Sequence, residues 1–139
     1  MRIRPTTIDD YPALYALWNQ SLTSVRANDD APEMIERFLE RNPALSVTAT
    51  SDTGEVIGGI LCGHDGRRGC LYHVAVAAAH RREGVGRAMV LACLENLRAA
   101  GIRKCTLVAF TQNDGGNAFW ERMGFYARGD LFYRDAWLD

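Results

Sequence analysis

The residues best suited to chemistry lie in segment 72–87, where an apolar run leads into a turn of arginines and glycines. Gly84 and Gly86 have no side chains, so a ligand can approach the backbone there closely. A helix is predicted to begin at about residue 84, and the first N–H groups of a helix have no partners within it. These groups and the helix dipole attract anions. The turn is therefore predicted to hold a pyrophosphate, with added positive charge from Arg81, Arg82 and Arg87.

Two common nucleotide-binding motifs do not fit this turn. A dinucleotide fold needs G-x-G-x-x-G, but the third glycine position is occupied by Met89. A P-loop needs a lysine directly after its last glycine, and Lys104 is the single lysine of the chain. Both motifs are excluded.

Composition narrows the classes of partner. The net charge of −1 over 139 residues argues against nucleic acid or an anionic membrane as a partner. The sequence contains no apolar run of the kind found in a signal peptide or a membrane span, so a cytoplasmic location is expected. The cysteines lack C-x-x-C spacing, and with three histidines no metal site is predicted. We expect reduced thiols, with a disulfide between Cys62 and Cys70 as the minor alternative.

The apolar periodicity predicts one α/β domain spanning residues 1–139. Its mixed, mostly antiparallel central sheet has about seven strands, at 3–5, 45–50, 55–62, 70–76, 102–110, 125–128 and 131–134. About four helices flank it, over 11–22, from a cap at Asp30 to a stop at Asn42, over 84–100 and over 116–123. The strand–helix–strand order around the third helix predicts one parallel pair of strands. Gly101 and Gly124 are expected to end the last two helices.

Two motifs on these elements carry a family resemblance. The pattern Arg81-x-x-Gly84-x-Gly86, directly after an apolar strand, resembles the acetyl-CoA signature R/Q-x-x-G-x-G/A of the GNAT superfamily of N-acetyltransferases. Segment 113–125 is similar to that family's closing motif, an asparagine before a helix that ends in an aromatic pair and then Gly-Phe. The order of predicted elements matches the family from residue 2 to about residue 135.

The resemblance implies a GNAT-like fold with a splayed parallel pair of strands, and acetyl-CoA as the acyl-donating co-substrate. The pyrophosphate would lie on the amides of residues 82–87, and the pantetheine arm would pair with the strand at Val74–Val76. The amide of Val76 would hydrogen-bond the acetyl carbonyl. Asn113 would contact the arm, and Phe119 would pack beside it. The cofactor-binding residues implied are Val74, Ala75, Val76, Arg81, Arg82, Glu83, Gly84, Val85, Gly86, Arg87, Asn113, Phe119 and Trp120.

The sequence departs from the family at the acid. Relatives commonly place a tyrosine at the second aromatic of the closing motif, whereas this chain has Trp120, whose indole N–H is a donor that does not serve as a proton source. Trp120 is expected to line the thioester channel or the substrate pocket. Strand parity places Tyr72, Val74 and Val76 on one face, so Tyr72 is a candidate for proton transfer or for lining the pocket. His73 falls on the other face unless the strand bulges.

The acceptor pocket is expected to use helix one, the loop 23–29 and the last strands, with candidate contacts Trp18, Asn19, Arg26 and Asp29. Outside candidates for proton transfer are Tyr126, Tyr133 and Glu121, and a chain of water molecules. The predicted function is direct transfer of an acetyl group from acetyl-CoA to a primary amine of a small molecule or a protein, by a monomer or a homodimer. The alternatives are an acyl-CoA-binding module that has lost catalysis, suggested by Trp120, and a protein that binds a nucleotide or nucleic acid, which the failed motifs and the net charge of −1 disfavour.

Overall fold

A computed structural model of the protein describes residues 1–21, 25 and 28–138. The chain forms two compact units, Met1–Val108 and Ala109–Asp139. None of the helices in the described ranges is long and apolar enough to cross a membrane.

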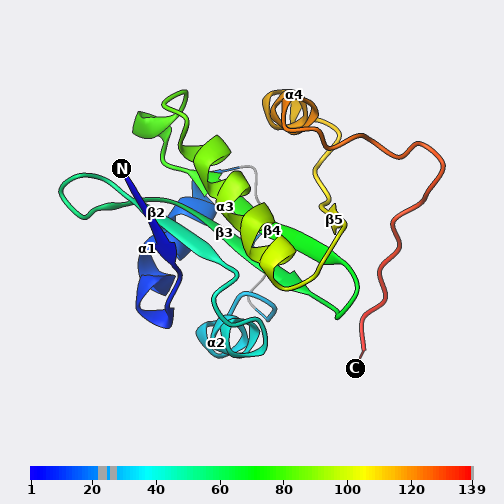
Figure 1. The fold of residues 1–139 in the computed structure, drawn as a ribbon, viewed down its shortest axis with the longest axis horizontal. Helices are drawn as coiled ribbons and strands as arrows, with labels where there is room; N and C mark the ends of the chain where they lie inside the picture. Colours follow the sequence, from blue (N-terminus) through cyan, green and yellow to red (C-terminus); the bar gives the residue numbers. More distant parts are fainter. Residues whose placement is uncertain (22–24, 26–27, 139) are drawn as a thin grey trace. The chain divides into compact units, whose positions relative to one another are not determined.

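The first unit is built on a mixed sheet of five strands in the order β1-β2-β3-β4-β5 (Figure 1). The three pairings that join β1 to β4 are antiparallel, and β5 runs parallel to β4. The predicted α/β class and the parallel pair are confirmed. The strands are β1 (Arg2–Pro5), β2 (Val47–Thr50), β3 (Val56–His64), β4 (Gly69–Val76) and β5 (Cys105–Thr106).

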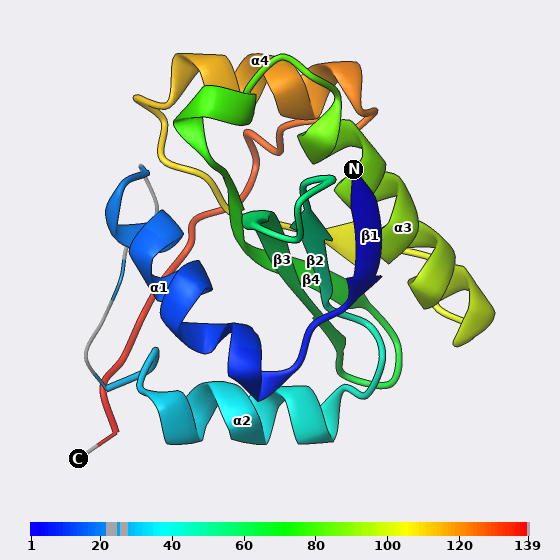
Figure 2. The same cartoon turned by 90° about the vertical axis from the view of Figure 1, so that its left-hand side faces the viewer.

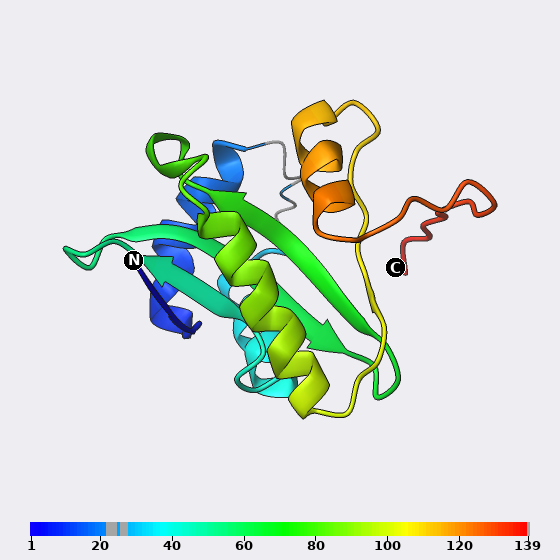
Figure 3. The ribbon, with the colours of Figure 1, turned by 45° about the horizontal axis from the view of Figure 1, so that its top comes forward.

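Helices cover both faces of this sheet. α3 lies along one face (Figure 3), and α1 and α2 pack on the other (Figure 2). The helices of the first unit are the short 3-10 turns η1 (Ile8–Asp10) and η2 (Ala78–His80) and the α-helices α1 (Tyr11–Asn19), α2 (Pro32–Arg41) and α3 (Val85–Ala99). The second unit contains α4 (Asp114–Arg122).

Two adjacent glycines in the central strand allow both layers of helices to approach the sheet. A Cβ on Gly58 would lie 2.9 Å from Met89 of α3, whereas a Cβ on Gly59 would overlap Leu14 of α1 on the opposite face. Met89 and Leu14 are both almost fully buried. The absence of these two side chains therefore sets the spacing of the layers, since a packed interior has no room for an added methyl group.

The ends of α3 and α4 follow the sequence prediction. Gly101 has φ +82° and its N–H donates to the carbonyl of Arg98, while the next amide, that of Ile102, donates to Leu97. Gly124 has φ +90° and ends α4 in the same way. Glycine suits both positions because a side chain strains the left-handed backbone.

The strand predictions at the end of the chain are wrong. The strand predicted over 102–110 shortens to Cys105–Thr106, and residues 125–138 contain neither helix nor strand. Most of that segment is exposed, including Phe132 and Leu138, and an ion pair between Arg128 and Asp130 at 2.8 Å shapes its turn. A two-stranded hairpin without further partners is marginal in water, so alternating residues alone do not secure the predicted pair.

The expected capping role of Asp30 is also wrong. α2 begins one residue later, with Ala31 at the N-cap and Pro32 at the first helical position. Proline is favoured there because its fixed φ suits a helix and its missing N–H removes an orphan donor. Asp30 therefore lies before the helix, and its buried carboxylate contacts His73 of β4.

A buried ion pair joins β1 to the start of α1. The carboxylate of Asp10 accepts two hydrogen bonds from Arg4, at 2.7 and 2.8 Å, and one from the amide of Thr7 at 2.9 Å. Burial by itself raises the pKa of Asp10, but these hydrogen bonds and one from Thr48 lower the pKa by more, so it lies below its ordinary value.

We expect Asp10→Asn to lower the free energy of unfolding at pH 7 by about 3 kcal/mol, because it leaves a partly buried guanidinium without its partner. The pKa of Asp10 is lower in the folded protein than its value of about 3.9 in the unfolded chain. The ionised carboxylate therefore stabilises the fold at pH values above about 3.9, and this stabilisation is lost as the pH falls through the pKa of the folded state. The difference between wild type and variant should therefore shrink below about pH 4 in urea unfolding. Asp9→Asn is the matched control, since Asp9 is exposed; an equal loss in both variants would contradict the assignment.

Candidate active site

The pairing of β4 with β5 ends early, and within the described ranges no other strand pairs with the rest of that β4 edge. The register joins Gly69 to Cys105 and Cys70 to Thr106, and stops there. At the far end of β4, the N–H of Ala77 donates to the carbonyl of Ile57 next to β3, at 2.8 Å. Alternate residues of an antiparallel strand direct their backbone groups to opposite sides, so the N–H of Val76 points away from β3, toward the edge without a strand.

The turn between η2 and α3 directs several amides outward. Arg82 has φ +63° and Gly84 has φ +82°, a backbone shape that forms anion-binding concavities. In the described part of the chain no carbonyl accepts from the amides of residues 82–87, as expected at a helix N-terminus. The turn is also exposed, apart from Val85, which is buried under the helix.

Side chains of this turn hold its shape. The Nε of Arg81 donates to the carbonyl of Val76 at 3.4 Å, which links the turn to the end of β4. His80 Nδ1 and Glu83 Oε1 lie 3.2 Å apart. The donor set, free amides with arginines beside them, fits a polyanion such as a pyrophosphate.

A bulge in β4 overturns the predicted strand parity. Residues pair as Gly59 with Ala75 and Leu61 with Tyr72, so β4 has one residue more than β3 between these pairs. His73 at the bulge has φ +49°, a conformation that costs a residue with a side chain roughly 1–2 kcal/mol. The bulge was not predictable, because no glycine or asparagine marks it.

The consequence is that Tyr72 and Val76 do not share a face. Tyr72 pairs with Leu61 of the core cluster and lies edge-on to Phe38 of α2, with ring centroids 5.8 Å apart. Val76 pairs with Gly58, whose missing Cβ faces α3. The parity argument for Tyr72 is therefore wrong, although its role in proton transfer stays a prediction. Tyr72 is 45% exposed, so a ligand can reach it.

His73 also faces the α1–α2 side and forms a close pair with Asp30. The imidazole Nε2 lies 2.7 Å from Asp30 Oδ1, and the two side chains are 15% and 8% exposed. The ring of Trp18 covers the imidazole at a centroid distance of 4.6 Å. Asp30 is in turn fixed through its carbonyl, which accepts a 2.6 Å hydrogen bond from Tyr11 Oη. This pair was not predicted from the sequence, because its members are 43 residues apart.

An aromatic cluster on α1 surrounds the pair. Tyr11, Tyr15 and Trp18 contact one another with centroid distances between 5.5 and 6.4 Å. Burial raises the pKa of Tyr11, and the nearby Tyr15, Asp30 and Glu33 raise it further. The phenol therefore remains a hydrogen-bond donor to the Asp30 carbonyl at neutral pH.

The closing motif lies in the second unit, where its residues are mostly structural. Asn113 is the N-cap of α4, and its side-chain oxygen accepts from the amide of Gly116 at 3.0 Å. Trp120 is 9% exposed and packs edge-on against Phe119 and Phe125, at 4.9 and 5.2 Å. The predicted contacts of Asn113, Phe119 and Trp120 with the cofactor stay predictions.

The expected acceptor-pocket residues separate into different environments. Trp18 is a core residue, 1% exposed, whereas Asn19 and Asp29 are exposed. Arg26 lies outside the described residues. In the second unit, the outside candidates Glu121, Tyr126 and Tyr133 are exposed.

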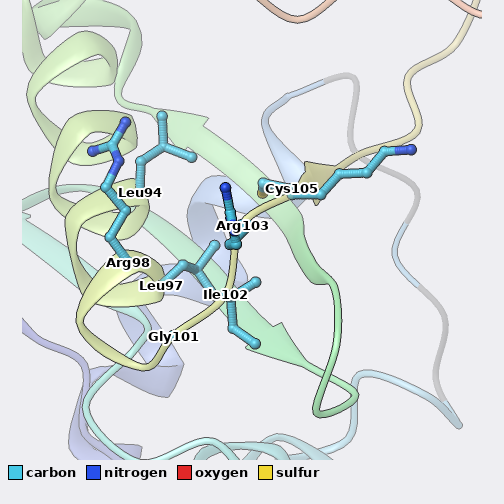
Figure 4. Close-up of a pocket in the computed structure, with 8 residues that line it drawn as sticks. Leu94, Leu97, Arg98, Gly101, Ile102, Arg103 and Cys105 are labelled. Atoms are coloured by element: carbon cyan, nitrogen blue, oxygen red, sulfur yellow. The ribbon is translucent and has the colours of Figure 1, made fainter.

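A cleft of about 460 Å³ lies at the other end of α3 (Figure 4). At 1.5 Å per residue, the 15-residue helix places it roughly 20 Å from the turn at Gly84. Basic side chains near a helix C-terminus complement the dipole there, so their presence is explained without a ligand. The cleft is lined by Leu94, Leu97, Arg98, Gly101, Ile102, Arg103, Lys104 and Cys105.

Two of the cysteines are buried and the other two are half-buried. All four are free, as expected. Cys62 and Cys93 are buried against each other between β3 and α3, and the hydrogen bond to Cys62 together with burial raises the pKa of Cys93. Burial raises the pKa of Cys105 to about 12. In the ranges that the structure describes, no three histidine, cysteine or acidic side chains gather as metal ligands.

Comparison with known proteins defines the class to which this fold and turn belong. Residues 11–125 match the Acetyltransferase (GNAT) family. Acetyltransferase SG1711 of Sodalis glossinidius is 33% identical over 126 residues, which cover 90% of this chain and 87% of that protein. The chain therefore belongs to the GNAT acetyltransferase family.

Solved structures of acetyltransferases have a similar fold. The chain is similar to Ard1 from Thermoplasma volcanium, with a TM-score of 0.79 and 25% identity over 88% of this chain and 80% of that one. It is similar in fold to the PaiA N-acetyltransferase from Thermoplasma acidophilum, determined in complex with coenzyme A, with a TM-score of 0.75 and 18% identity over 88% and 87% of the two chains. The GNAT fold predicted from the sequence is confirmed.

The cap of α4 gives a local prediction. Asn113→Ala should lower the local stability of α4 by about 1 kcal/mol, because the amide of Gly116 loses its acceptor. Hydrogen exchange of the α4 amides would measure this as faster exchange. Asn113→Asp keeps an acceptor and adds a negative charge at the helix N-terminus, so it should retain wild-type protection; faster exchange in both variants would show that the cap is not what stabilises the helix.

Proposed function

We propose that this acetyltransferase transfers the acetyl group of acetyl-CoA directly to a primary amine of a small molecule or a protein. The observation that carries the proposal is that two groups of backbone N–H donors lie close together in the sequence, one in the turn and one at the end of β4. The amides of residues 82–87 are free for a pyrophosphate, and the N–H of Val76 points to the β4 edge without a strand.

The chain's residues divide the work between these donor sets. The turn holds the cofactor's phosphates through its amides and arginines. The exposed edge at Val74–Val76 can pair with an amide-containing arm as an added strand. The N–H of Val76 then stabilises negative charge on the acetyl oxygen as the amine attacks. Membership of the GNAT family and the coenzyme A complex of the PaiA enzyme support acetyl-CoA as the donor.

A second candidate, an acyl-CoA-binding module without catalysis, is favoured by one residue. Trp120 stands where relatives commonly have a tyrosine acid, and it is packed into an aromatic cluster. An indole N–H donates a hydrogen bond but does not supply a proton. The two candidates differ in turnover and not in cofactor binding.

A screen of amine acceptors tests the proposal. Acetyl-CoA is incubated with polyamines, aminoglycosides, amino acids and peptides with free α-amines or lysines, and released thiol is measured. We expect at least one amine to raise thiol release above hydrolysis, with an acetylated product confirmed by mass. Thermal stabilisation by both CoA and acetyl-CoA without transfer would instead favour the binding module. Stronger stabilisation by ATP would show that the cofactor is wrong.

The turn itself gives a prediction with an internal control. Gly84→Ala and Gly54→Ala each add a methyl group at a left-handed position, φ +82° and +87°, with open space around it. Both should therefore lose about 1 kcal/mol of stability. Gly84→Ala should also lose most of the thermal shift that CoA gives, because the methyl group distorts the amide cradle. Equal CoA shifts in both variants would remove the turn from the binding site.

A further inference from the structure

We propose that His73 is the general base for acetyl transfer, acting through bound water, and that Asp30 positions it. The proposal rests on the function proposed above and assigns the proton acceptor in this chain. It is carried by the 2.7 Å contact between His73 Nε2 and Asp30 Oδ1 and by the backbone irregularity that makes this contact possible.

The contact selects one tautomer of the ring. A carboxylate oxygen accepts hydrogen bonds, so Nε2 carries the proton, an assignment made from the hydrogen-bond network. Nδ1 is then the nitrogen with the free electron pair. It has no hydrogen-bond partner among the residues that the structure describes. The result is an oriented imidazole with its basic nitrogen available.

The irregular backbone shows that this orientation is maintained against strain. His73 is one of three residues other than glycine with positive φ in the described ranges. Without the extra residue of the bulge, strict alternation would turn its side chain toward the opposite face from Tyr72. Instead both face the α1–α2 side, where Trp18 covers the ring and Asp30 binds it. Strain held by surrounding contacts is characteristic of functional positions.

The position suits an acceptor that arrives from the side opposite α3. α3 covers one face of the sheet, and the turn at its N-terminus is the proposed phosphate site. His73 faces the other side, three residues before Val76 in the same strand, which is roughly 10 Å at 3.3 Å per residue. Bound water spans the remaining gap between imidazole and amine.

The indole of Trp18 provides a second polar group next to the imidazole of His73. The indole N–H of Trp18 is buried and has no hydrogen-bond acceptor in the described part of the chain. Trp18 stacks on His73, so this donor lies close to the pair. Buried donors usually have a hydrogen-bond partner, and ordered water is one such partner.

The proposed step transfers the acetyl group to the amine and one proton to the thiolate. The amine nitrogen forms a bond to the acetyl carbonyl carbon, and the carbon–sulfur bond breaks with its electron pair leaving on sulfur. The proton lost by nitrogen passes through water to His73 Nδ1, and the imidazolium is stabilised by Asp30. The same proton then returns through water to the thiolate, giving the acetylated amine and the free thiol. No other reactant is needed.

The acidic arm of the pH–rate profile should report this base. The titratable groups around the imidazole are Asp30 from the loop before α2, Tyr72 beside it on β4, and Tyr11 and Tyr15 on α1. Of the side-chain types present, imidazole exchanges a proton closest to neutral pH.

The central experiment is chemical rescue of His73→Gly. Glycine accepts the left-handed backbone, so the variant keeps the bulge while removing the ring. With the amine that gives the highest rate in the acceptor screen, kcat/KM should fall roughly 10²–10⁴-fold, and the acidic arm should be lost. The KM for acetyl-CoA should stay near wild type. Added imidazole should restore the rate in proportion to the concentration of its neutral form.

Controls separate the base from a structural role. His64→Gly removes a histidine from the far end of β3 and should leave the pH profile unchanged. Asp30→Asn should lower kcat with a shifted acidic arm, since the amide orients the ring without stabilising its charged form. Stability loss in His73→Gly with an unchanged profile and no response to imidazole would overturn the proposal. The proposal would also be overturned if Tyr72→Phe, and not His73→Gly, lost the acidic arm of the pH–rate profile.

An NMR measurement does not depend on turnover. Long-range ¹⁵N–¹H spectra of the wild-type imidazoles, assigned with the His73→Gly variant, should show His73 protonated on Nε2, with a change in Asp30→Asn. Protonation on Nδ1 would overturn the proposal even if the enzyme is active. If the tautomer is as expected but no amine is acetylated by the wild type, the proposed function fails, and the role of His73 as base fails with it.

Discussion

The constraint on which the rest depends is that β4 pairs with β3 along one edge, whereas on the other edge the residues that the structure describes pair with it at two positions. Pairing with β3 runs from His64–Gly69 to Gly58–Val76, whereas pairing with β5 stops after two residues. A sheet edge with unpaired donors and acceptors binds another extended chain. The same strand leads directly into the turn at Gly84, so one continuous piece of backbone presents both kinds of donor.

The other face of β4 is organised by a single extra residue. The bulge turns two consecutive side chains, Tyr72 and His73, to the α1–α2 side. α2 begins at Pro32, so Asp30 lies before the helix, and its carboxylate contacts His73 of β4. Two local departures from regular structure, 43 residues apart, therefore meet in one contact.

The sequence predicted those parts of the fold that depend on local chemistry. Gly84, Gly101 and Gly124 marked the helix ends correctly, since each needs a backbone that glycine adopts readily. The His73–Asp30 pair was not predictable, because a bulge at a non-glycine residue leaves no mark in the periodicity. The C-terminal strands were predicted from alternation, which shows that a segment can form a strand but not that it finds a partner.

The charge around the turn consists of arginines, and this has a chemical consequence for an enzyme that handles a thioester. A lysine in place of Arg81, whose Nε lies 3.4 Å from the Val76 carbonyl, would put a side-chain amine, itself a nucleophile when neutral, near the proposed acyl site. A guanidinium stays protonated at every physiological pH, so it has no free electron pair with which to attack. The chain's 16 basic residues include one lysine, Lys104, which lines the cleft at the far end of α3. The turn can thus attract a polyanion without offering the enzyme's own surface as a competing acceptor.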